Sequence, residues 1–234
     1  MGTHPYCIVP AGHRPTGELV GIGDRPVEYM DTGALGVWMS SLDRAPEPNL
    51  PALRTHEAVG RAAARSGLTP LPLRFGGWVE DARTLTDGIH AREADFLQAL
   101  EDLAGMWEVG LRIVETSPLR AAGEEVARRD PPTPLQEGPG RAYLDLLADR
   151  RSADRLRMDA SEQALADFRT FLGTTVKDEM WISLQASDGL LSVAQLVHEG
   201  DIETWKEGVR HFRESRPDLR VFELGPWLPY SFAP

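Results

Sequence analysis

The sequence predicts an α+β fold of two domains, an N-terminal mixed α/β domain over residues 1–105 and a C-terminal ferredoxin-like domain over residues 106–234. Its length of 234 residues suits one large or two small domains, and its 41% hydrophobic and 26% charged residues are typical of globular proteins. The second half contains the clearest order of strand and helix patterns. The first half mixes short strands with helical segments and matches no standard order.

In the first half, short apolar runs separated by turn residues indicate strands, and alanine-rich or periodic runs indicate helices. Thr32 and Gly33 suit the turn of a hairpin between two of these strands. Gly67 is a suitable end for the alanine- and arginine-rich helix. The predicted elements are strands at 6–11, 18–23, 26–33 and 34–42, a helix at 52–65, an extended segment at 70–77 and one helix at 81–105.

The second half begins with the run "WEVGLRIVE" at 107–115, in which apolar residues alternate with Glu108, Gly110 and Arg112. This alternation predicts a strand with one core face and one polar face. The order strand, helix, strand, strand, helix, strand is the split βαβ arrangement called ferredoxin-like. Its predicted parts are a loop at 118–139, helical patterns at 141–151 and 161–172, strands at 179–187 and 190–200 joined by a turn at 188–189, a helix at 201–214 and a strand at 219–224.

Charge and cysteine content exclude several classes of protein. The formal charge of −11 and the interspersed arginines oppose binding to a nucleic acid backbone. Cys7 is the only cysteine, so no intrachain disulfide is possible, and a cytoplasmic location is expected. No secretory signal and no run of about 20 apolar residues is present, so no membrane partner is expected.

The candidate small-ligand motifs have plain structural interpretations. "GPGRAYL" at 138–144 could hold an anion at a helix N-terminus with help from Arg141, but no P-loop lysine or serine follows, and a helix-starting turn is preferred. His90 and Glu93 share one helical face, yet a metal site needs three or four converging ligands. His56 is expected to be packed and hydrogen-bonded rather than catalytic. We therefore predict no metal, no cofactor and no catalytic residue.

An alternative function remains open at this point. Glu108 and Arg112 lie on one face of the same predicted strand, and with Arg141 they could line a cleft between the domains. A small-ligand-binding protein or an enzyme would need these three side chains to converge with perturbed pKa values. A surface ion pair is the default interpretation of Glu108 and Arg112.

The chain ends with "GPWLPYSFAP", a stretch with three aromatic residues and three prolines. The prolines forbid a helix, and burial of the aromatic rings would favour a tail that packs back across the ferredoxin-like sheet or the domain junction. An exposed tail that inserts into the groove of a partner is the alternative. Trp227, Tyr230 and Phe232 on this tail, with Arg74 and Phe75 in the segment at 70–77, are the candidate partner-binding residues, because aromatic residues and arginine dominate binding hot spots.

Taken in order, several segments resemble the gas vesicle protein L/F family and together span nearly the whole chain. They are "PVEYMDTGALGVWMSSL", the helix with His56, "LPLRFGGWVED", "WEVGLRIV", "GPGRAYL" and the terminal "GPWLPYSF". The resemblance implies a two-domain α+β protein with a ferredoxin-like C-terminal part. It implies a non-enzymatic accessory protein of gas vesicles that binds the hydrophobic shell protein, and other accessory proteins, and assists shell nucleation or assembly.

Overall fold

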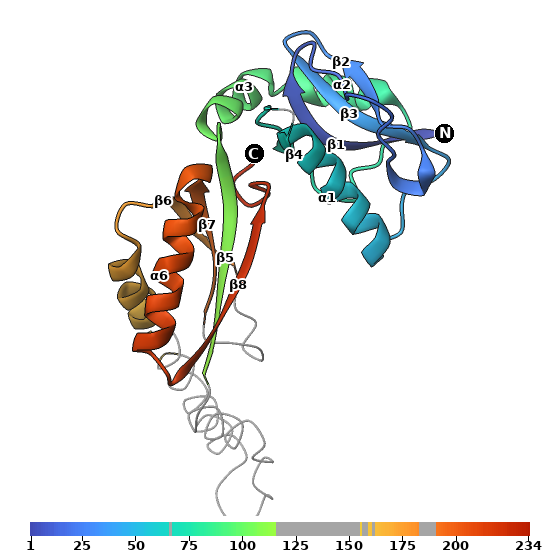
Figure 1. Cartoon of the computed structure of the whole chain (residues 1–234). Coiled ribbons are helices and arrows are strands. Elements are labelled where there is room, and N and C mark those ends of the chain that lie inside the picture. The colour runs from blue at the N-terminus through green and yellow to red at the C-terminus, as the bar shows by residue number, and fades with distance from the viewer. Residues whose placement is uncertain (66, 116–154, 156–158, 161, 183–190) are drawn as a thin grey trace, which may run out of the picture. The chain divides into compact units, whose positions relative to one another are not determined.

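The protein was analysed as a computed structural model that describes residues 1–65, 67–115, 155, 159–160, 162–182 and 191–234. The described chain forms two compact units (Figure 1). Unit 1 contains Met1–Glu108 together with Pro226–Pro234, and unit 2 contains Val109–Gly225. The last nine residues, which we call the tail, therefore belong to unit 1, although they follow unit 2 in the sequence. The predicted C-terminal domain over residues 106–234 includes them.

Unit 1 is a four-stranded sheet covered by helices, with the strand order β2-β3-β1-β4. Strand β1 is buried along almost its whole length, which requires cover on both faces of the sheet. Helix α1 packs on one face, and in Figure 1 α2 passes behind the strands. The elements are β1 (Gly2–Pro10), the 3-10 turn η1 (Ile22–Asp24), β2 (Glu28–Asp31), β3 (Leu35–Leu42), α1 (Leu50–Arg65), β4 (Leu71–Pro72), α2 (Ala82–His90) and α3 (Glu93–Asp102).

The hairpin predicted in the first half is present. Strands β2 and β3 pair antiparallel, and the Thr32 amide donates to the Leu35 carbonyl across the turn at 3.0 Å. Gly33 adopts φ of 91° there, a conformation that glycine reaches without strain.

Two predictions in the first half were wrong. Residues 18–23 do not form a strand of the sheet; Val20 makes an isolated bridge to Pro26, and η1 follows. The single helix predicted at 81–105 is two helices, α2 and α3, because Arg92 between them leaves helical geometry with φ −127° and ψ 20°. The apolar periodicity continues through this break, so the sequence pattern does not reveal it.

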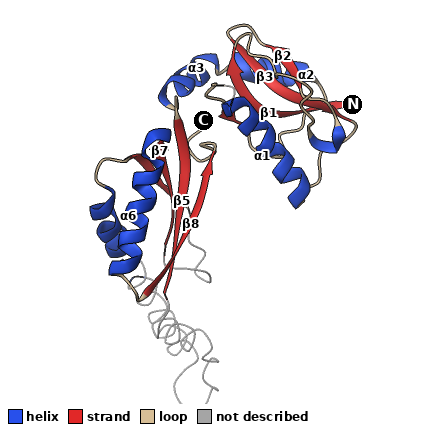
Figure 2. Cartoon of the chain, viewed as in Figure 1, coloured by secondary structure: helices blue, strands red, loops and turns tan. Residues whose placement is uncertain are grey.

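Unit 2 has the predicted order of elements, with helical residues 162–172 between its first two strands and the strand order β6-β7-β5-β8. This arrangement is compatible with the ferredoxin-like fold. Strands and helices are distinguished by colour in Figure 2. The elements are β5 (Met106–Glu115), β6 (Val176–Trp181), β7 (Leu191–His198), η2 (Glu199–Asp201), α6 (Ile202–Ser215) and β8 (Leu219–Trp227). The loop predicted at 118–139, the helical pattern at 141–151 and the turn at 188–189 lie outside the described residues.

The core of unit 2 is apolar and aromatic. Helix α6 and the helical residues 162–172 cover one face of the sheet, and the rings of Phe168 and Phe212 meet edge to face with centroids 5.1 Å apart. The expected apolar face of α6 is confirmed, since Trp205, Val209 and Phe212 are all buried. On β5 the predicted core residues Val109, Leu111 and Ile113 are buried, but Glu108 and Gly110 of the expected polar face are buried as well.

Candidate functional site

The tail contains a short turn formed by its own hydrogen bonds. The Tyr230 amide donates to the Leu228 carbonyl at 2.8 Å, and the Ala233 amide donates to the Pro229 carbonyl at 2.9 Å. Pro229 fixes its own backbone angle within this turn. The tail is therefore a locally organised segment rather than an extended end.

A missing side chain on α1 makes room for the tail. Leu228 is only 2% exposed, and a Cβ atom built on Gly60 would lie 2.5 Å from its Cδ1 atom. Any larger residue at position 60 would occupy the space that the leucine fills. Burial of a leucine side chain contributes about 1.5 to 3 kcal/mol, so this notch is a main apolar anchor of the tail.

Arg61, the next residue of α1, holds the backbone at the start of the tail. Its Nη2 atom donates to the Pro226 carbonyl, and its Nε atom donates to the Glu57 carboxylate at 2.8 Å. The guanidinium group also lies over the Trp107 ring, 5.7 Å from its centroid. Three contacts fix the direction of this arginine, which presents a preorganised donor to the peptide carbonyl.

Glu108 binds the far end of the tail with both of its carboxylate oxygens. The Ser231 amide donates to one oxygen at 2.7 Å, and the Ser231 hydroxyl donates to the other at 2.8 Å. Glu108 is 6% exposed, so its charge is compensated by these two donors in a buried setting. The residues that receive the tail, His56, Glu57, Gly60, Arg61 and Glu108, are called the tail groove below.

His56 of the tail groove is hydrogen-bonded to a second buried histidine, His4. His56 Nε2 lies 2.7 Å from the Leu73 carbonyl, which can only accept, so Nε2 carries the proton. In the neutral ring Nδ1 is then an acceptor, and it receives a hydrogen bond from His4 Nε2 at 3.0 Å. His4 Nδ1 is left as a buried acceptor without a hydrogen-bond partner among the described residues.

Burial keeps both histidines neutral. It lowers the pKa of His4 to about 4, and the neighbouring His56 acts in the same direction. Burial also lowers the pKa of His56, although the Leu73 carbonyl and Glu57 oppose this shift. A proton on His56 Nδ1 would remove the acceptor for His4 Nε2, whereas a proton on His4 Nδ1 would place a buried charge where no described residue accepts a hydrogen bond from it.

Tyr230 of the tail lies next to His56 of this pair. Its ring centroid is 6.3 Å from that of His56. Burial raises the pKa of its hydroxyl above the usual range, and Glu57 raises it further through charge and a hydrogen bond. The tyrosine is therefore a neutral donor to the groove, and the sequence expectation that His56 is packed and hydrogen-bonded is confirmed.

The five predicted partner-binding residues fall into two settings. Arg74 is exposed, and the half-buried Phe75 packs against the His4 and His56 rings with centroids 5.6 and 5.7 Å away. The other three are half-buried on the tail: Trp227, Tyr230 and Phe232. All five belong to unit 1.

The residues of the alternative cleft have other surroundings. Glu108 is engaged by Ser231, whereas Arg112 is exposed on β5 in unit 2. Arg141 and the "GPGRAYL" segment lie outside the described residues. Buried Cys7 has a thiol whose pKa is raised by burial, which makes it an unreactive core residue.

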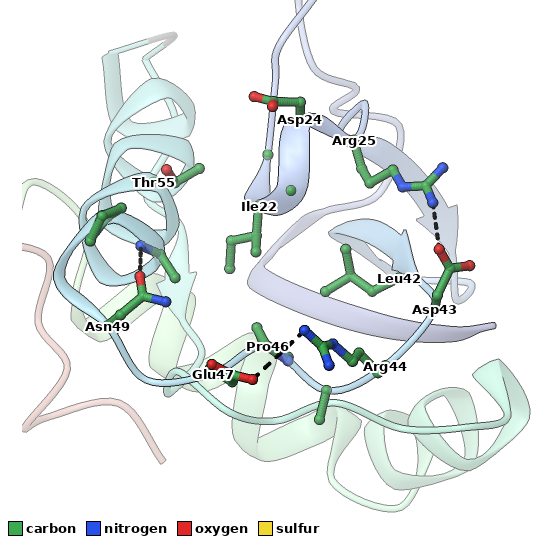
Figure 3. Close-up of a pocket in the computed structure, with 15 residues that line it drawn as sticks. Ile22, Asp24, Arg25, Leu42, Asp43, Arg44, Pro46, Glu47, Asn49 and Thr55 are labelled. Carbon is green, nitrogen blue, oxygen red and sulfur yellow. Dashed lines mark hydrogen bonds and ion pairs between the residues drawn. The ribbon is translucent and has the colours of Figure 1, made fainter.

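A separate pocket of about 560 Å³ lies at the other end of α1 (Figure 3). It is bounded by η1, by the loop that follows β3 and by the first turns of α1, where Asn49 Oδ1 accepts from the Ala52 amide at 2.9 Å. Four of the five charged residues that line it form two ion pairs. Arg25 meets Asp43 at 2.7 Å, and Arg44 and Glu47 are 3.7 Å apart.

The described part of the chain contains neither a cluster of metal ligands nor a membrane-spanning helix. Within it, no three His, Cys, Asp or Glu side chains are grouped so that they could hold a metal ion; His90 instead meets the Thr32 carbonyl at 2.9 Å. None of the helices seen there has the length and apolar character needed to cross a membrane.

The sequence analysis missed the parts of the site that depend on distant contacts. Nothing in the sequence marks Gly60 as a notch, because a glycine inside an alanine-rich helix also occurs without a packing role. The polar face expected for β5 did not suggest that Glu108 is buried. Sequence patterns also did not indicate that several large apolar residues of unit 2 are exposed. These are Met180, Trp181 and Ile182 at the end of β6, and Phe222 and Leu224 on β8.

Comparisons with known proteins agree on one family. A sequence model described as "Gas vesicle synthesis protein GvpL/GvpF" matches residues 2–234. Gas vesicle protein L of Streptomyces sp. (strain CB03234) is 34% identical over 230 residues, covering 93% of this chain and 80% of that protein. Gas vesicle protein L1 of Halobacterium salinarum is 26% identical over 265 residues, covering 100% of this chain and 90% of that protein.

Solved structures show the same fold. The crystal structure of the gas vesicle protein GvpF from Anabaena sp. PCC7120 matches with a TM-score of 0.79 and 19% identity, covering 100% of this chain and 96% of that one. GvpF from Microcystis aeruginosa matches with a TM-score of 0.78 and 20% identity, covering 100% and 99%. At these identities the likeness concerns the α+β architecture alone.

Proposed function

This chain belongs to the GvpL/GvpF family of gas vesicle synthesis proteins, and from that premise we propose that it binds the hydrophobic shell protein and assists nucleation or assembly of the shell. Its membership supports a role as a gas vesicle accessory protein. The observation that carries the proposal is the family match over residues 2–234, since it includes both units and the tail. Other accessory proteins of the vesicle are further partners under this proposal.

The proposed role is non-enzymatic. Binding the shell protein requires apolar and aromatic contact, not a reacting group. Of the buried polar residues of the tail groove, Glu108 is bonded to Ser231 of the tail, and His56 is bonded to His4 and to the Leu73 carbonyl. We propose a location in the cytoplasm and at the vesicle shell.

The proposed binding surface comprises Arg74 and Phe75 with the half-buried rings of the tail, Trp227, Tyr230 and Phe232. Rings that are partly exposed and partly anchored present apolar area at little cost in side-chain entropy. Arg74 is exposed next to Phe75 in the sequence and would contribute a charge at the rim. Phe75 also packs on the histidine pair, so its substitution would disturb the fold as well as binding.

Capture of the purified main shell protein by the full-length chain tests the proposal. We expect Arg74→Glu and Trp227→Ala to reduce capture at least fivefold while circular dichroism stays unchanged. Arg54→Glu, a charge reversal at an exposed position of α1, is the matched control and should retain capture.

A further variant tests separately whether the chain binds the shell protein and whether the proposed residues form the binding surface. Phe222 of β8 is 49% exposed in unit 2, and Phe222→Ser removes apolar area there. Lost capture by Phe222→Ser with normal capture by Arg74→Glu would refute the proposed surface and keep the partner. Absence of capture by the wild-type chain, with folding intact, would refute the proposed partner.

A further inference from the structure

The tail is bound by unit 1 in the way that a peptide is bound by a receptor. The groove offers a donor for a backbone carbonyl at Arg61, a notch for one leucine at Gly60, and a carboxylate for a backbone amide and hydroxyl at Glu108. Apolar side-chain pockets combined with main-chain hydrogen bonds are the usual elements of peptide recognition. These contacts specify a short sequence and not a general apolar surface.

The tail also has the properties of a ligand that is organised before it binds. Its two internal hydrogen bonds form a turn, and its prolines restrict the free chain, which lowers the entropy lost on docking. None of its side chains is charged. Its docking therefore does not add to the repulsion between two copies that each carry a formal charge of −11.

The tail is covalently linked to unit 2 but belongs to unit 1. The chain leaves unit 2 at Gly225, and the tail begins at Pro226 in unit 1. Gly225 has φ of 92°, so this junction uses a conformation that other residues reach only with strain. A segment that is linked to one unit and bound by another is the arrangement from which exchange between identical chains arises.

We propose that the tail groove of one copy takes the tail of a second copy, so that tail exchange links copies of this protein. The contacts are the same within one chain and between two, because the groove recognises only the tail itself. At low protein concentration the tail of the same chain fills the groove, since its effective concentration is high. Crowding of copies on a common surface shifts the balance towards exchange. The inference does not depend on which residues bind the shell protein.

A peptide of residues 225–234 tests recognition in trans. The receptor is full-length Leu228→Asp, in which a charge on the chain's own tail opposes burial in the notch and leaves the groove open. We expect the fluorescein-labelled wild-type peptide to bind this receptor, as measured by anisotropy, and a peptide carrying Leu228→Asp to bind at least tenfold more weakly.

The groove is identified by a second pair of receptors. Adding Gly60→Leu to the receptor fills the notch and should abolish binding. Adding Gly88→Leu instead is the matched control, because no atom lies within 4 Å of a Cβ built at Gly88 of α2. Equal binding by the two receptors, or no binding by a folded receptor, would overturn the proposal.

Exchange between intact chains is tested by disulfide trapping. Glu108→Cys and Ser231→Cys are made in separate full-length chains, mixed and oxidised at increasing protein concentration. The Ser231 hydroxyl lies 2.8 Å from Glu108 Oε1, so a disulfide between these two positions reports a tail that has entered the other copy's groove. Cys7 is buried and does not compete.

The control mixture pairs Ser231→Cys with Gly88→Cys. We expect at least ten times more covalent dimer from the Glu108→Cys mixture, rising with concentration, on a non-reducing gel. Equal yields from both mixtures would overturn exchange between intact chains. If Glu108→Cys does not fold, the peptide experiment decides the proposal.

Discussion

The two units of this protein share a strand order but differ in how they close their cores. In each, the four strands lie in the spatial order second, third, first, fourth, and a helix joins the third strand to the fourth: α1 in unit 1 and α6 in unit 2. Unit 2 has a further helical segment, residues 162–172, between its first two strands. In unit 1 the corresponding stretch is a loop with the short turn η1.

The cores reflect this difference. Unit 2 buries aromatic and aliphatic residues, with Gln195 bonded to the Trp205 indole as a satisfied polar pair at 2.8 Å. Unit 1 buries the His4–His56 pair and relies on a segment from the other end of the chain to cover it. Unit 2 is thus stabilised mainly by aromatic and aliphatic packing, whereas unit 1 adds a buried histidine pair and a distant peptide to its apolar core. We expect the two cores to respond differently to mutation and pH.

The largest expected effect lies in the aromatic core of unit 2. Phe212 is fully buried against Phe168 and Phe171, with ring centroids 5.1 and 6.0 Å away. Phe212→Ala should cost about 3 to 5 kcal/mol of unfolding free energy through lost burial and the cavity left behind. Urea unfolding measures the loss, and hydrogen exchange should place it in unit 2. A loss shared equally by both units would break the distinction between the two cores.

The next effect tests how much unit 1 depends on the tail. Leu228→Ala should cost about 2 to 3 kcal/mol, at the low end for a buried leucine, because a short tail can relax into the space. Leu224→Ala, on β8 just before the tail, is the matched control, and at 36% exposed it should cost less than half as much. Hydrogen exchange should increase in α1 for Leu228→Ala. A cost no greater than that of the control would show that unit 1 is stable without the tail.

The fold of unit 2 was predictable because each element has a clear local period. The alternation in β5 and the apolar face of α6 identify their types, and the order of elements limits the topology. Unit 1 was less predictable, since its first crossover has no helix and a break at Arg92 divides an otherwise periodic segment. In both places backbone geometry overrides a sequence pattern.

The site was predictable only in part. The composition of the tail indicates that it packs on the protein, and the position of His56 on α1 indicates burial. The partner of the tail could not be derived, because Glu108 and Ser231 are 123 residues apart and each has an ordinary surface role in isolation. Recognition through the Gly60 notch depends on the absence of a side chain, and the pattern of apolar and polar residues along α1 does not reveal which glycine has this role.

Acid should destabilise unit 1 more than unit 2. The folded pKa of His4 is lowered from 6.5 to about 4, so the stabilising contribution is present above pH 6.5 and is lost as pH falls towards 4. At pH 5 the loss from this group is about 2 kcal/mol, since the unfolded chain takes up a proton that the folded chain excludes. Burial of His56 adds to the loss, and Glu57 opposes it.

Urea unfolding at pH 7.5 and pH 5 measures this effect. His4→Gln cannot titrate, and it should lower stability at pH 7.5 while flattening the dependence on pH. His211→Gln, at an exposed position of α6, is the control and should retain the dependence. An unchanged acid response in His4→Gln would assign the sensitivity to other groups.

The smallest expected effects concern the ion pairs. Here unit 2 has the more extensive polar contacts, whereas in the cores it is unit 1 that depends on polar groups. In unit 2, Arg216 bonds both Asp167 and Asp218 at 2.8 Å, and its side chain is 30% exposed. In unit 1, Arg25 pairs with a single carboxylate among the described residues, that of Asp43, and the two side chains are 43% and 69% exposed. Arg216→Ala should cost about 1 kcal/mol and Arg25→Ala about 0.5 kcal/mol or less, because an exposed pair is screened by water and salt. Thermal unfolding in low and high salt measures both. A larger loss of stability for Arg25→Ala than for Arg216→Ala would mean that the loop after β3, which lines the pocket, depends on the Arg25–Asp43 pair. Unit 1 would then rely on polar contacts at its surface as well as in its core.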